Sequence, residues 1–399
     1  MTRGRGAGRL PTRVRPAEAD DWPRIARIRR LAFRWPGELE VQLPGMWVLD
    51  DGRGVQACAR LESEGQWFGG RIVPTALLSS VAVAPEARGR GVGSELLDAL
   101  LHEARASGLA ATTLYPSALR PYRRAGFEIG GHHVTLAADT RDLPLRGEEL
   151  AEEASADDLA MLCAAYDRLA ATRDGPIARS ELWWRTRVLA SRPPTPREDP
   201  DLEVYVVRSA AGATGYTIFR QAADGPEPYG GRIVCQDLVW LEEGAARSLL
   251  GLMGGARPLV TSVEWPGSAD DPLGALLDDP PRVAASEPWM SRLLDPAAAI
   301  EARGYPPALT ADLRFRVADP LDPSWSVGLR VRIEAGRAHV TSARRPAPSV
   351  DVGTLSAILS GGLDPASALR LGRLGASPDE LQGFRALYPA GPRWIGDRF

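Results

Sequence analysis

One stretch constrains the fold of this chain more than any other: a buried strand, a glycine-rich turn and an apolar helix that follow one another directly. Residues 77–84 (LLSSVAVA) have the length and β-branched content of a buried strand, and Pro85 ends it. From Ser94 onward, SELLDALLHEARASG places its leucines on one helical stripe. Residues 88–93 (RGRGVG) lie between these two segments. This order predicts an α/β domain, which closes at about residue 139.

The turn has the chemistry of an anion site. Three glycines stand within five positions: Gly89, Gly91 and Gly93. Without a Cβ they let backbone amides approach an anion closely, and the following helix adds the positive end of its dipole. Arg88 and Arg90 add guanidinium groups, which suit phosphoryl oxygens. Glycine-rich turns are also common without any ligand, so a phosphate cradle and a plain flexible turn are the two interpretations.

Two common nucleotide motifs do not fit this turn. Ser94 stands where G-x-G-x-x-G needs its third glycine. All 48 residues counted as Lys or Arg are Arg, so a Walker A lysine is absent, as is any lysine for Schiff-base chemistry. Classical dinucleotide sites, P-loops and pyridoxal-phosphate enzymes are therefore excluded.

The rest of the chain repeats the same layout. Its 399 residues predict two or three domains at roughly 150 residues each. An acidic linker at 141–158 leads to further helices and strands, and a strand at 232–239 precedes the apolar helix SLLGLM. Here the turn carries Glu242 and Glu243, with one glycine instead of three. The last hundred residues predict strands at 311–318 and 327–333 and helices at 351–361 and 377–386.

Composition limits the partners to expect. A formal net charge of -3 gives no reason to expect nucleic acid or a membrane, and the Arg-rich first fifteen residues predict a solvated tail. No signal peptide or membrane-spanning run is expected. The 3 cysteines are odd in number and far apart, which fits reduced thiols and a cytoplasmic location. His132 and His133 are adjacent and would point to opposite faces of a strand, so no metal site is expected.

Two motifs point to a family. Residues 88–93 fit R-x-x-G-x-G, preceded by VAVAP and followed by the apolar helix, and residues 122–127 (YRRAGF) fit Y-x-x-x-G-F. With both, the chain resembles the GNAT superfamily of N-acyltransferases, in which the first motif binds the pyrophosphate of acyl-CoA and the tyrosine lies near the thioester sulfur. The resemblance implies acetyl-CoA as acyl donor and no metal. At a pKa of about 10, Tyr122 keeps its proton at neutral pH and can donate it to the departing thiolate. A packing tyrosine is the alternative.

Three further segments resemble the Eis (enhanced intracellular survival) acetyltransferase family over nearly the whole chain: residues 20–23 (DDWP), 79–85 (SSVAVAP) and 298–305 (AAIEARGY). The resemblance implies an α/β (α+β) chain of tandem GNAT folds, each a mixed, mostly antiparallel sheet flanked by helices, and a sterol-carrier-like α/β domain at the C-terminus. The domains expected are 1–139, 140–290 and 291–399. A homo-oligomer, a hexamer in that family, is also implied. In that family the second GNAT domain lacks a working cofactor loop, and the carboxylates of Glu242 and Glu243 would repel a pyrophosphate, so one CoA site per chain is expected.

The resemblance also assigns residues to the site. The expected cofactor-binding residues are Ser79, Ser80, Val81, Val83, Arg88, Gly89, Arg90, Gly91, Val92, Gly93 and Ser117. Main-chain groups of the strand would pair with the pantetheine arm, and an amide near Ser80 or Val81 would meet the developing oxyanion. The terminal carboxylate of Phe399 would act as base. Because an α-carboxylate has a pKa of about 3.5, desolvation, a water relay or electrostatic holding of the substrate ammonium stay open as its way of acting. A frayed chain end is the alternative.

The reaction implied is direct acetyl transfer to the amine of a small molecule, without a covalent enzyme intermediate. Phe33 and Trp35 could bind a flat or apolar acceptor by stacking, with core packing as the alternative for Phe33. The rival function is a non-catalytic CoA- or lipid-binding module that uses the GNAT fold as a scaffold.

Overall fold

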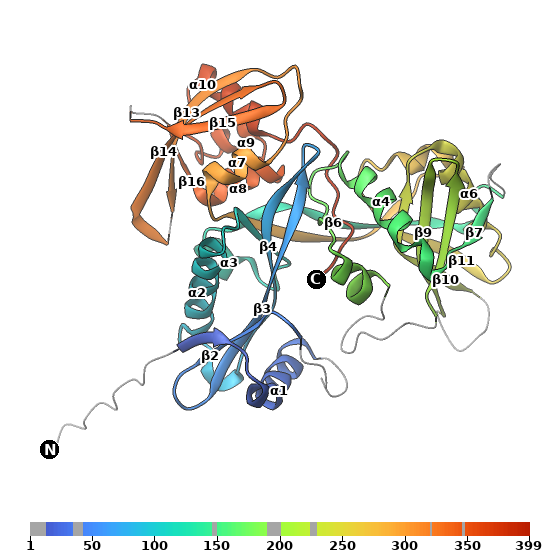
Figure 1. Ribbon diagram of the computed structural model, residues 1–399, viewed down its shortest axis with the longest axis horizontal. Coiled ribbons are helices and arrows are strands. Elements are labelled where there is room, and N and C mark those ends of the chain that lie inside the picture. Colours follow the sequence, from blue (N-terminus) through green and yellow to red (C-terminus); the bar gives the residue numbers. More distant parts are fainter. Residues whose placement is uncertain are drawn as a thin grey trace.

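The computed structural model describes residues 13–34, 43–145, 150–189, 201–223, 230–319, 321–344 and 348–399. Two sheet-and-helix lobes and a smaller lobe of strands and helices meet around the chain's C-terminus (Figure 1). The mixed α/β class expected from the sequence is confirmed.

The described strands form two sheets. Those of the large sheet are β1 Arg13–Pro16, β2 Met46–Asp50, β3 Val55–Phe68, β4 Arg71–Val83, β5 Ala111–Leu114, β6 Glu128–Asp139, β7 Ala151–Glu153, β8 Glu203–Ser209, β9 Gly212–Ala222, β10 Gly231–Trp240, β11 Val260–Gly267 and β12 Arg282–Leu293. They form a 12-stranded sheet in the order β1-β2-β3-β4-β5-β12-β6-β11-β10-β9-β8-β7. The small sheet contains β13 Ala311–Asp319, β14 Asp322–Glu334, β15 Arg337–Ser342 and β16 Ser349–Asp351, in the order β15-β14-β13-β16.

The helices fall into three groups along the chain. The first part has α1 Trp22–Phe33, α2 Val92–Ala106 and α3 Leu119–Arg124, the second has α4 Leu159–Ala170, α5 Glu181–Trp183 with a π-helical turn at Trp184–Val188, and α6 Glu243–Gly254. The C-terminal part has α7 Pro296–Ala302, α8 Val352–Ser360, α9 Pro365–Arg370 and α10 Pro378–Leu387. The expected strand, turn and helix at 77–108 are confirmed as β4 and α2.

Two long strands join the halves of the large sheet. β12 lies between β5 and β6, pairing with β5 at Met290–Leu293 and with β6 along most of its length. β6 in turn pairs with β11 through Val134–Asp139. A strand from residues 282–293 therefore completes the sheet begun by residues 13–114, and the sheet runs without a break past residue 139. The division at 1–139, 140–290 and 291–399 stays a prediction.

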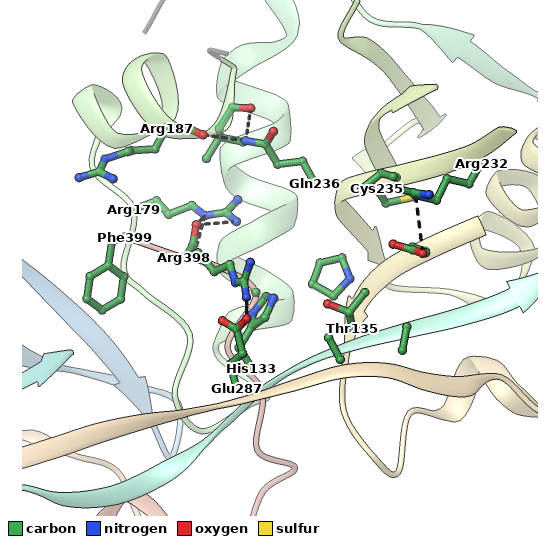
Figure 2. Close-up of a pocket in the computed structure, with 18 of the residues that line it drawn as sticks. His133, Thr135, Arg179, Arg187, Arg232, Cys235, Gln236, Glu287, Arg398 and Phe399 are labelled. Atoms are coloured by element: carbon green, nitrogen blue, oxygen red, sulfur yellow. Dashed lines mark hydrogen bonds and ion pairs between the residues drawn. The ribbon is translucent and has the colours of Figure 1, made fainter. Parts of the chain in front are cut away.

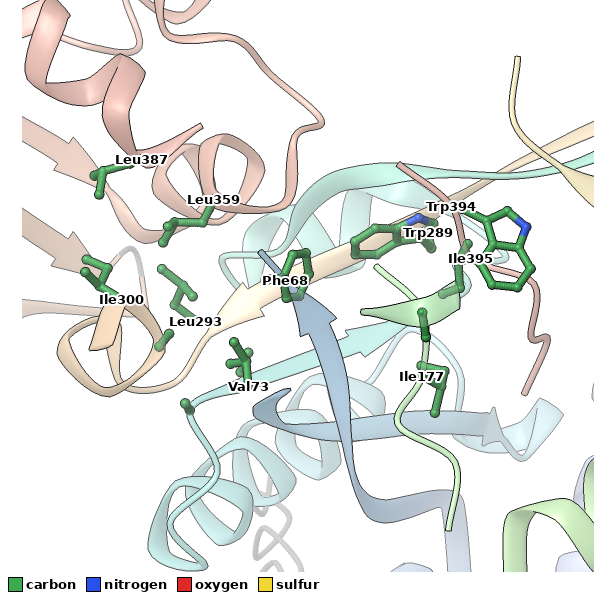
Figure 3. Close-up of a cluster of buried hydrophobic side chains, with 14 of the residues drawn as sticks. Phe68, Val73, Ile177, Trp289, Leu293, Ile300, Leu359, Leu387, Trp394 and Ile395 are labelled. Carbon is green, nitrogen blue, oxygen red and sulfur yellow. The ribbon is translucent and has the colours of Figure 1, made fainter. Parts of the chain in front are cut away.

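The largest hydrophobic core crosses all three parts of the chain. Phe68 from β3, Trp289 and Leu293 from β12, Leu359 from α8 and Ile395 near the C-terminus belong to one cluster (Figure 3). Ile395 is fully buried and Trp394 is 7% exposed. Phe399 is half-buried and packs against the same cluster, so the chain end is packed against the core in this structure, and its role in the site stays a prediction.

Candidate active site

The first half of the sheet opens at one place. β4 and β5 are parallel and pair through Thr75–Leu77 and Ala111–Thr113. β4 continues to Val83, whereas within the described residues its pairing with β5 ends at Leu77. Beyond that point the two strands separate and leave main-chain groups of β4 available.

A bulge lies in the part of β4 that no longer pairs with β5 but still pairs with β3. The register against β3 shifts between Cys58 and Arg60, opposite residues 80 and 81, and Ser80 has a φ of +55°, in the left-handed region. Such a conformation is costly for a residue with a Cβ and occurs where the surrounding structure imposes it, often at functional sites. The bulge turns main-chain groups of Ser80 and Val81 out of the regular ladder.

The glycine-rich turn follows directly. Gly89 and Gly91 have φ values of +72° and +84°, which glycine adopts without strain. Gly91 is the N-cap of α2, so the first amides of that helix face the turn. A Cβ on Gly93 would lie 3.2 Å from Cγ2 of Val83 on β4, so this glycine allows close packing of helix on strand.

The bulge and the turn open onto one cleft. It has a volume of about 560 Å³ and brings the expected catalytic residue Tyr122 together with most of the expected cofactor residues: Val81, Val83, Arg88, Gly89, Gly91, Val92, Gly93 and Ser117. Ser79 and Ser80 belong to β4 but do not line it, and Arg90 points toward Asp51, with 3.8 Å between Nη2 and Oδ2. Leu321, from the C-terminal domain, forms part of the wall and was not expected from the sequence.

This cleft fits an acyl-CoA. Its left-handed glycines and the N-terminus of α2 form a cradle for the diphosphate, and the splayed edge of β4 can pair with an amide-bearing arm. The Arg88 guanidinium lies on β4, with Nε donating to the Val83 carbonyl oxygen at 3.4 Å. The residues present therefore suit a ligand with a phosphate at one end and a thioester near the bulge.

Tyr122 lies in the cleft wall on α3. Its ring is 8% exposed and its edge meets Phe127, with 5.9 Å between the ring centroids. Burial raises the pKa of Tyr122 above its ordinary value. The phenol therefore keeps its proton at neutral pH and above.

Phe399 lies in a second pocket of about 650 Å³, on the side of the second GNAT-like half. Its ring centroid is 5.2 Å from that of Tyr115, just beyond β5, and 6.2 Å from that of Trp183. The two pockets have no lining residue in common. Tyr115 links them along the chain, because Ser117 two residues later lines the first cleft.

The remaining sequence expectations have mixed outcomes. Phe33 is half-buried at the end of α1, against the core of the first domain, and Trp35 lies outside the described residues. His133 is buried, its Nδ1 lies 2.9 Å from the Ile395 carbonyl oxygen, and burial lowers its pKa. In the described ranges no group of three or more His, Cys, Asp or Glu side chains could hold a metal.

A set of buried charges around the C-terminus could not be predicted from the sequence. Asp397 accepts hydrogen bonds from Arg179 and from Trp183 Nε1, and Arg179 also pairs with Asp237. Arg179 and Asp397 are 218 residues apart, so no local pattern could have connected them. The one indication in the sequence was that Asp397 is an acidic residue two positions before Phe399, which the resemblance already placed in the site.

The comparisons with known proteins agree with the geometry. Acetyltransferase (GNAT) domain families match residues 13–130 and 175–293, and a sterol carrier protein domain family matches residues 296–396. The chain belongs to the GNAT acetyltransferase family, as a tandem of two such domains followed by a sterol-carrier domain. It is an acyltransferase, and GNAT domains typically use acetyl-CoA.

Relatives and solved structures extend over most of the chain. An uncharacterized N-acetyltransferase of Streptomyces avermitilis is 31% identical over 77% of this chain and 76% of its own. One of Streptomyces griseus is 27% identical over 97% of this chain and 98% of its own. In fold, a GCN5-related N-acetyltransferase from Anabaena variabilis matches with a TM-score of 0.88 at 23% identity, over 98% of this chain and 100% of that one. Eis1 from Mycobacterium abscessus matches with a TM-score of 0.77 at 24% identity, over the same shares, which confirms the expected Eis-like architecture.

The described helices include none that is long and apolar enough to span a membrane.

Proposed function

We propose that this protein is an acetyl-CoA-dependent N-acetyltransferase that transfers an acetyl group directly to an amine of a small molecule. The observation that carries the proposal is the meeting, in one cleft, of the β4 bulge, the left-handed glycine turn and Tyr122. A module that only held CoA would need the turn, but not a buried phenol beside the splayed strand. A sequential reaction with both substrates bound fits this arrangement.

Each part of the cleft has a separate task in this proposal. Amides at the start of α2, with Arg88, would hold the diphosphate. The edge of β4 from Ser79 to Val83 would pair with the pantetheine arm. A main-chain amide at the bulge, on Ser80 or Val81, would donate to the thioester oxygen as negative charge develops there. When bound, the thioester supplies an activated acetyl carbonyl.

Two protons have to move. As the new N–C bond forms and the C–S bond breaks, Tyr122 would give its proton to the leaving sulfur, and the Phe399 carboxylate would take up the proton released from the amine. An amine must lose its own proton before attack, and a carboxylate close by can accept it directly or through water. Burial raises the pKa of Tyr122, so the phenol is protonated at neutral pH and available as the acid, while the same shift makes it a weaker proton donor than a free tyrosine.

The test is release of free thiol from acetyl-CoA, measured across aminoglycosides, arylalkylamines and lysine-containing peptides. Tyr122→Phe should lower kcat by about 10²–10⁴-fold and leave the dissociation constant of CoA unchanged. Tyr205→Phe, on β8 of the second domain, is the matched control and should keep the wild-type kcat. Failure of every amine to give turnover would exclude the enzyme proposal, and equal rates for Tyr122→Phe and wild type would remove Tyr122 from it.

The role of Phe399 has its own test. A three-residue extension after Phe399 moves the carboxylate away, so kcat should fall steeply while acetyl-CoA still binds. The same extension placed at the N-terminus is the control. Unchanged turnover with the C-terminal extension would show that another group accepts the proton.

We also propose a cytoplasmic homo-oligomer without nucleic acid as partner. The hexamer rests on the family resemblance alone. Light scattering on the purified protein measures its mass, and a monomer would refute this part.

A further inference from the structure

The second GNAT domain retains the opened cleft of the first domain without its phosphate turn. β10 and β11 are parallel and pair at Gly231–Val234, as β4 and β5 do, and β10 has a register shift between Cys235 and Asp237, as β4 has at its bulge. Between β10 and α6 there are only two residues, Leu241 and Glu242. Between β4 and α2 there is the whole glycine-rich turn. The cleft of the second domain has therefore lost the element that would hold a diphosphate.

A buried carboxylate lies beside the bulge of the second domain. Asp237 has no exposed surface and accepts two hydrogen bonds from Arg179, at 2.5 and 2.8 Å, and one from the Tyr216 hydroxyl at 2.9 Å. The Arg179 side chain is 1% exposed and lies 3.8 Å from the ring centroid of Tyr166. These contacts fix the guanidinium with its Nε directed away from β10.

Arg179 Nε donates to the chain's own C-terminal segment. Asp397 accepts from Arg179 Nε with 3.1 Å to each carboxylate oxygen, from Trp183 Nε1 at 3.1 Å and from the Tyr166 hydroxyl at 3.3 Å. Figure 2 shows Arg179, Arg398 and Phe399 around the same pocket, and its wall includes Gln236 and Cys235 of β10. The side chain two residues before the chain end is thus bound where the second domain has its bulge.

The same segment is bound at several further points, through its backbone and through the Trp394 side chain. Trp394 donates its amide to the Asp174 carbonyl oxygen at 3.0 Å and its Nε1 to the Pro266 carbonyl oxygen of β11 at 3.2 Å. Tyr115 donates its hydroxyl to the Asp397 carbonyl oxygen at 2.7 Å. The segment is therefore held by β11 on one side and, through Tyr115, by the first domain on the other.

We propose that the cleft of the second GNAT domain is a peptide-binding site whose ligand is the chain's own segment Trp394–Phe399, and that Arg179, by binding Asp397, positions the terminal carboxylate for the first domain. The binding half of this inference stands on the contacts above. The positioning half rests on the proposed function. In both, Arg179 and Asp397 are positioning residues that act through Phe399.

The experiment uses the full chain and two independent measurements. Carboxypeptidase release of Phe399, followed by intact mass, reports whether the segment stays bound. Steady-state kinetics with acetyl-CoA and an accepted amine reports positioning. The variants are Asp397→Asn and Asp397→Glu, and the control is Asp312→Asn, which breaks an exposed Asp–Arg pair with Arg330 in the C-terminal domain.

Asp397→Asn should release Phe399 at least about tenfold faster, because a neutral amide accepts a weaker hydrogen bond from the Arg179 guanidinium than a carboxylate does, while Asp237 still neutralises that guanidinium. Its kcat should fall by about tenfold or more while the KM for acetyl-CoA stays within about twofold, since the CoA cleft shares no residue with this site. Asp312→Asn should change neither. If Asp397→Asn does not fold, Asp397→Glu is the deciding variant. It keeps the negative charge, so Phe399 should stay protected from carboxypeptidase. Its longer side chain displaces the segment, so kcat should fall.

Two results would overturn the inference. Release of Phe399 at the wild-type rate in folded Asp397→Asn refutes the peptide site. A fall in kcat accompanied by a matching rise in the KM for acetyl-CoA shows a general structural defect and refutes the positioning role. Absence of turnover in the wild-type protein would refute the proposed function alone, because the release measurement does not depend on activity.

Discussion

Replacing Ser94 by Asp tests whether α2 and its turn hold a diphosphate. Ser94 is the third residue of α2 and lines the cleft. A carboxylate in the first turn of a helix is favourable for the helix itself, by about 0.3–1 kcal/mol, because it faces the positive end of the dipole. The same carboxylate repels an anion bound there. The two effects therefore have opposite signs, one on the free energy of unfolding and one on the affinity for acetyl-CoA.

The repulsion can be estimated from Coulomb's law. Two like charges about 6 Å apart at an effective dielectric constant of about 20 repel by about 2.8 kcal/mol. Screening at physiological salt, with a Debye length of about 8 Å, reduces this to about 1.3 kcal/mol. Each phosphate charge at that distance then costs about a factor of ten in affinity. We expect the dissociation constant of acetyl-CoA to rise about ten- to hundredfold in Ser94→Asp.

The assay is isothermal titration with CoA, together with thermal unfolding in the absence of ligand. Ser94→Asn has the same shape as Ser94→Asp without the charge, so it separates electrostatics from packing. Ser94→Asp should bind weakly and unfold at or above the wild-type temperature, whereas Ser94→Asn should bind nearly as wild type does. Equal affinities for Ser94→Asp and Ser94→Asn would refute the anion cradle.

The remaining predictions concern stoichiometry, packing and pH. Titration should give one CoA per chain, because the turn after β10 carries Glu242 and lacks the glycines; two equal sites would contradict this. Gly126→Ala should lower the free energy of unfolding in urea by about 2–4 kcal/mol, since φ is +79° and the new Cβ would lie 1.9 Å from Nη1 of Arg292, which is paired with Asp319; wild-type stability would refute this. Burial raises the pKa of Tyr305 to about 12, so the folded state keeps a proton that the unfolded chain loses above pH ~10, and this part of the stability is lost as pH rises. Between pH 9 and 11 the loss in urea should be about 1.3 kcal/mol smaller in Tyr305→Phe than in wild type, and equal slopes would refute the assignment.

Local periodicity predicted the catalytic half well. β4 has a continuous run of buried and β-branched residues, α2 has an apolar stripe of period 3.6, and their turn carries glycines that the left-handed φ values require. β6 is different, because Gly130 and Gly131 interrupt its pattern and indicate a break after Ile129. The strand continues because the Trp289 ring lies over these glycines, where a Cβ on Gly130 would come within 2.3 Å of it. A tertiary contact thus explains a residue choice that misleads local analysis.

β12 could not be predicted, for a related reason. Its first half is exposed, so the residues RVAASE show no alternation of apolar and polar side chains. It is a strand because β6 pairs with it along that half. The buried pair Arg179–Asp397 has the same origin, since only the complete fold brings its two residues together. The sequence therefore predicts the parts of the site that lie close together in the chain, such as the turn between β4 and α2. It does not predict contacts between residues that are far apart in the chain.

The shared strands also set the distance that the C-terminal segment has to cover. In the sheet, β12 and β6 lie between β5 and β11, so these two nearer strands of the clefts are three steps apart, about 14 Å at about 4.8 Å per strand, and the bulged strands β4 and β10 are five steps apart, about 24 Å. From Asp397, held in the second domain, two further residues reach about 7 Å. The bound Asp397 lies between the clefts, where Tyr115 of the first domain donates to its carbonyl oxygen, and the Phe399 ring packs on Tyr115 with 5.2 Å between the centroids, so the chain end contacts the residue that follows β5 of the first domain. A second domain that had kept its own phosphate turn would gain a redundant cofactor site, whereas one that binds the chain end turns the same cleft into a support for the first.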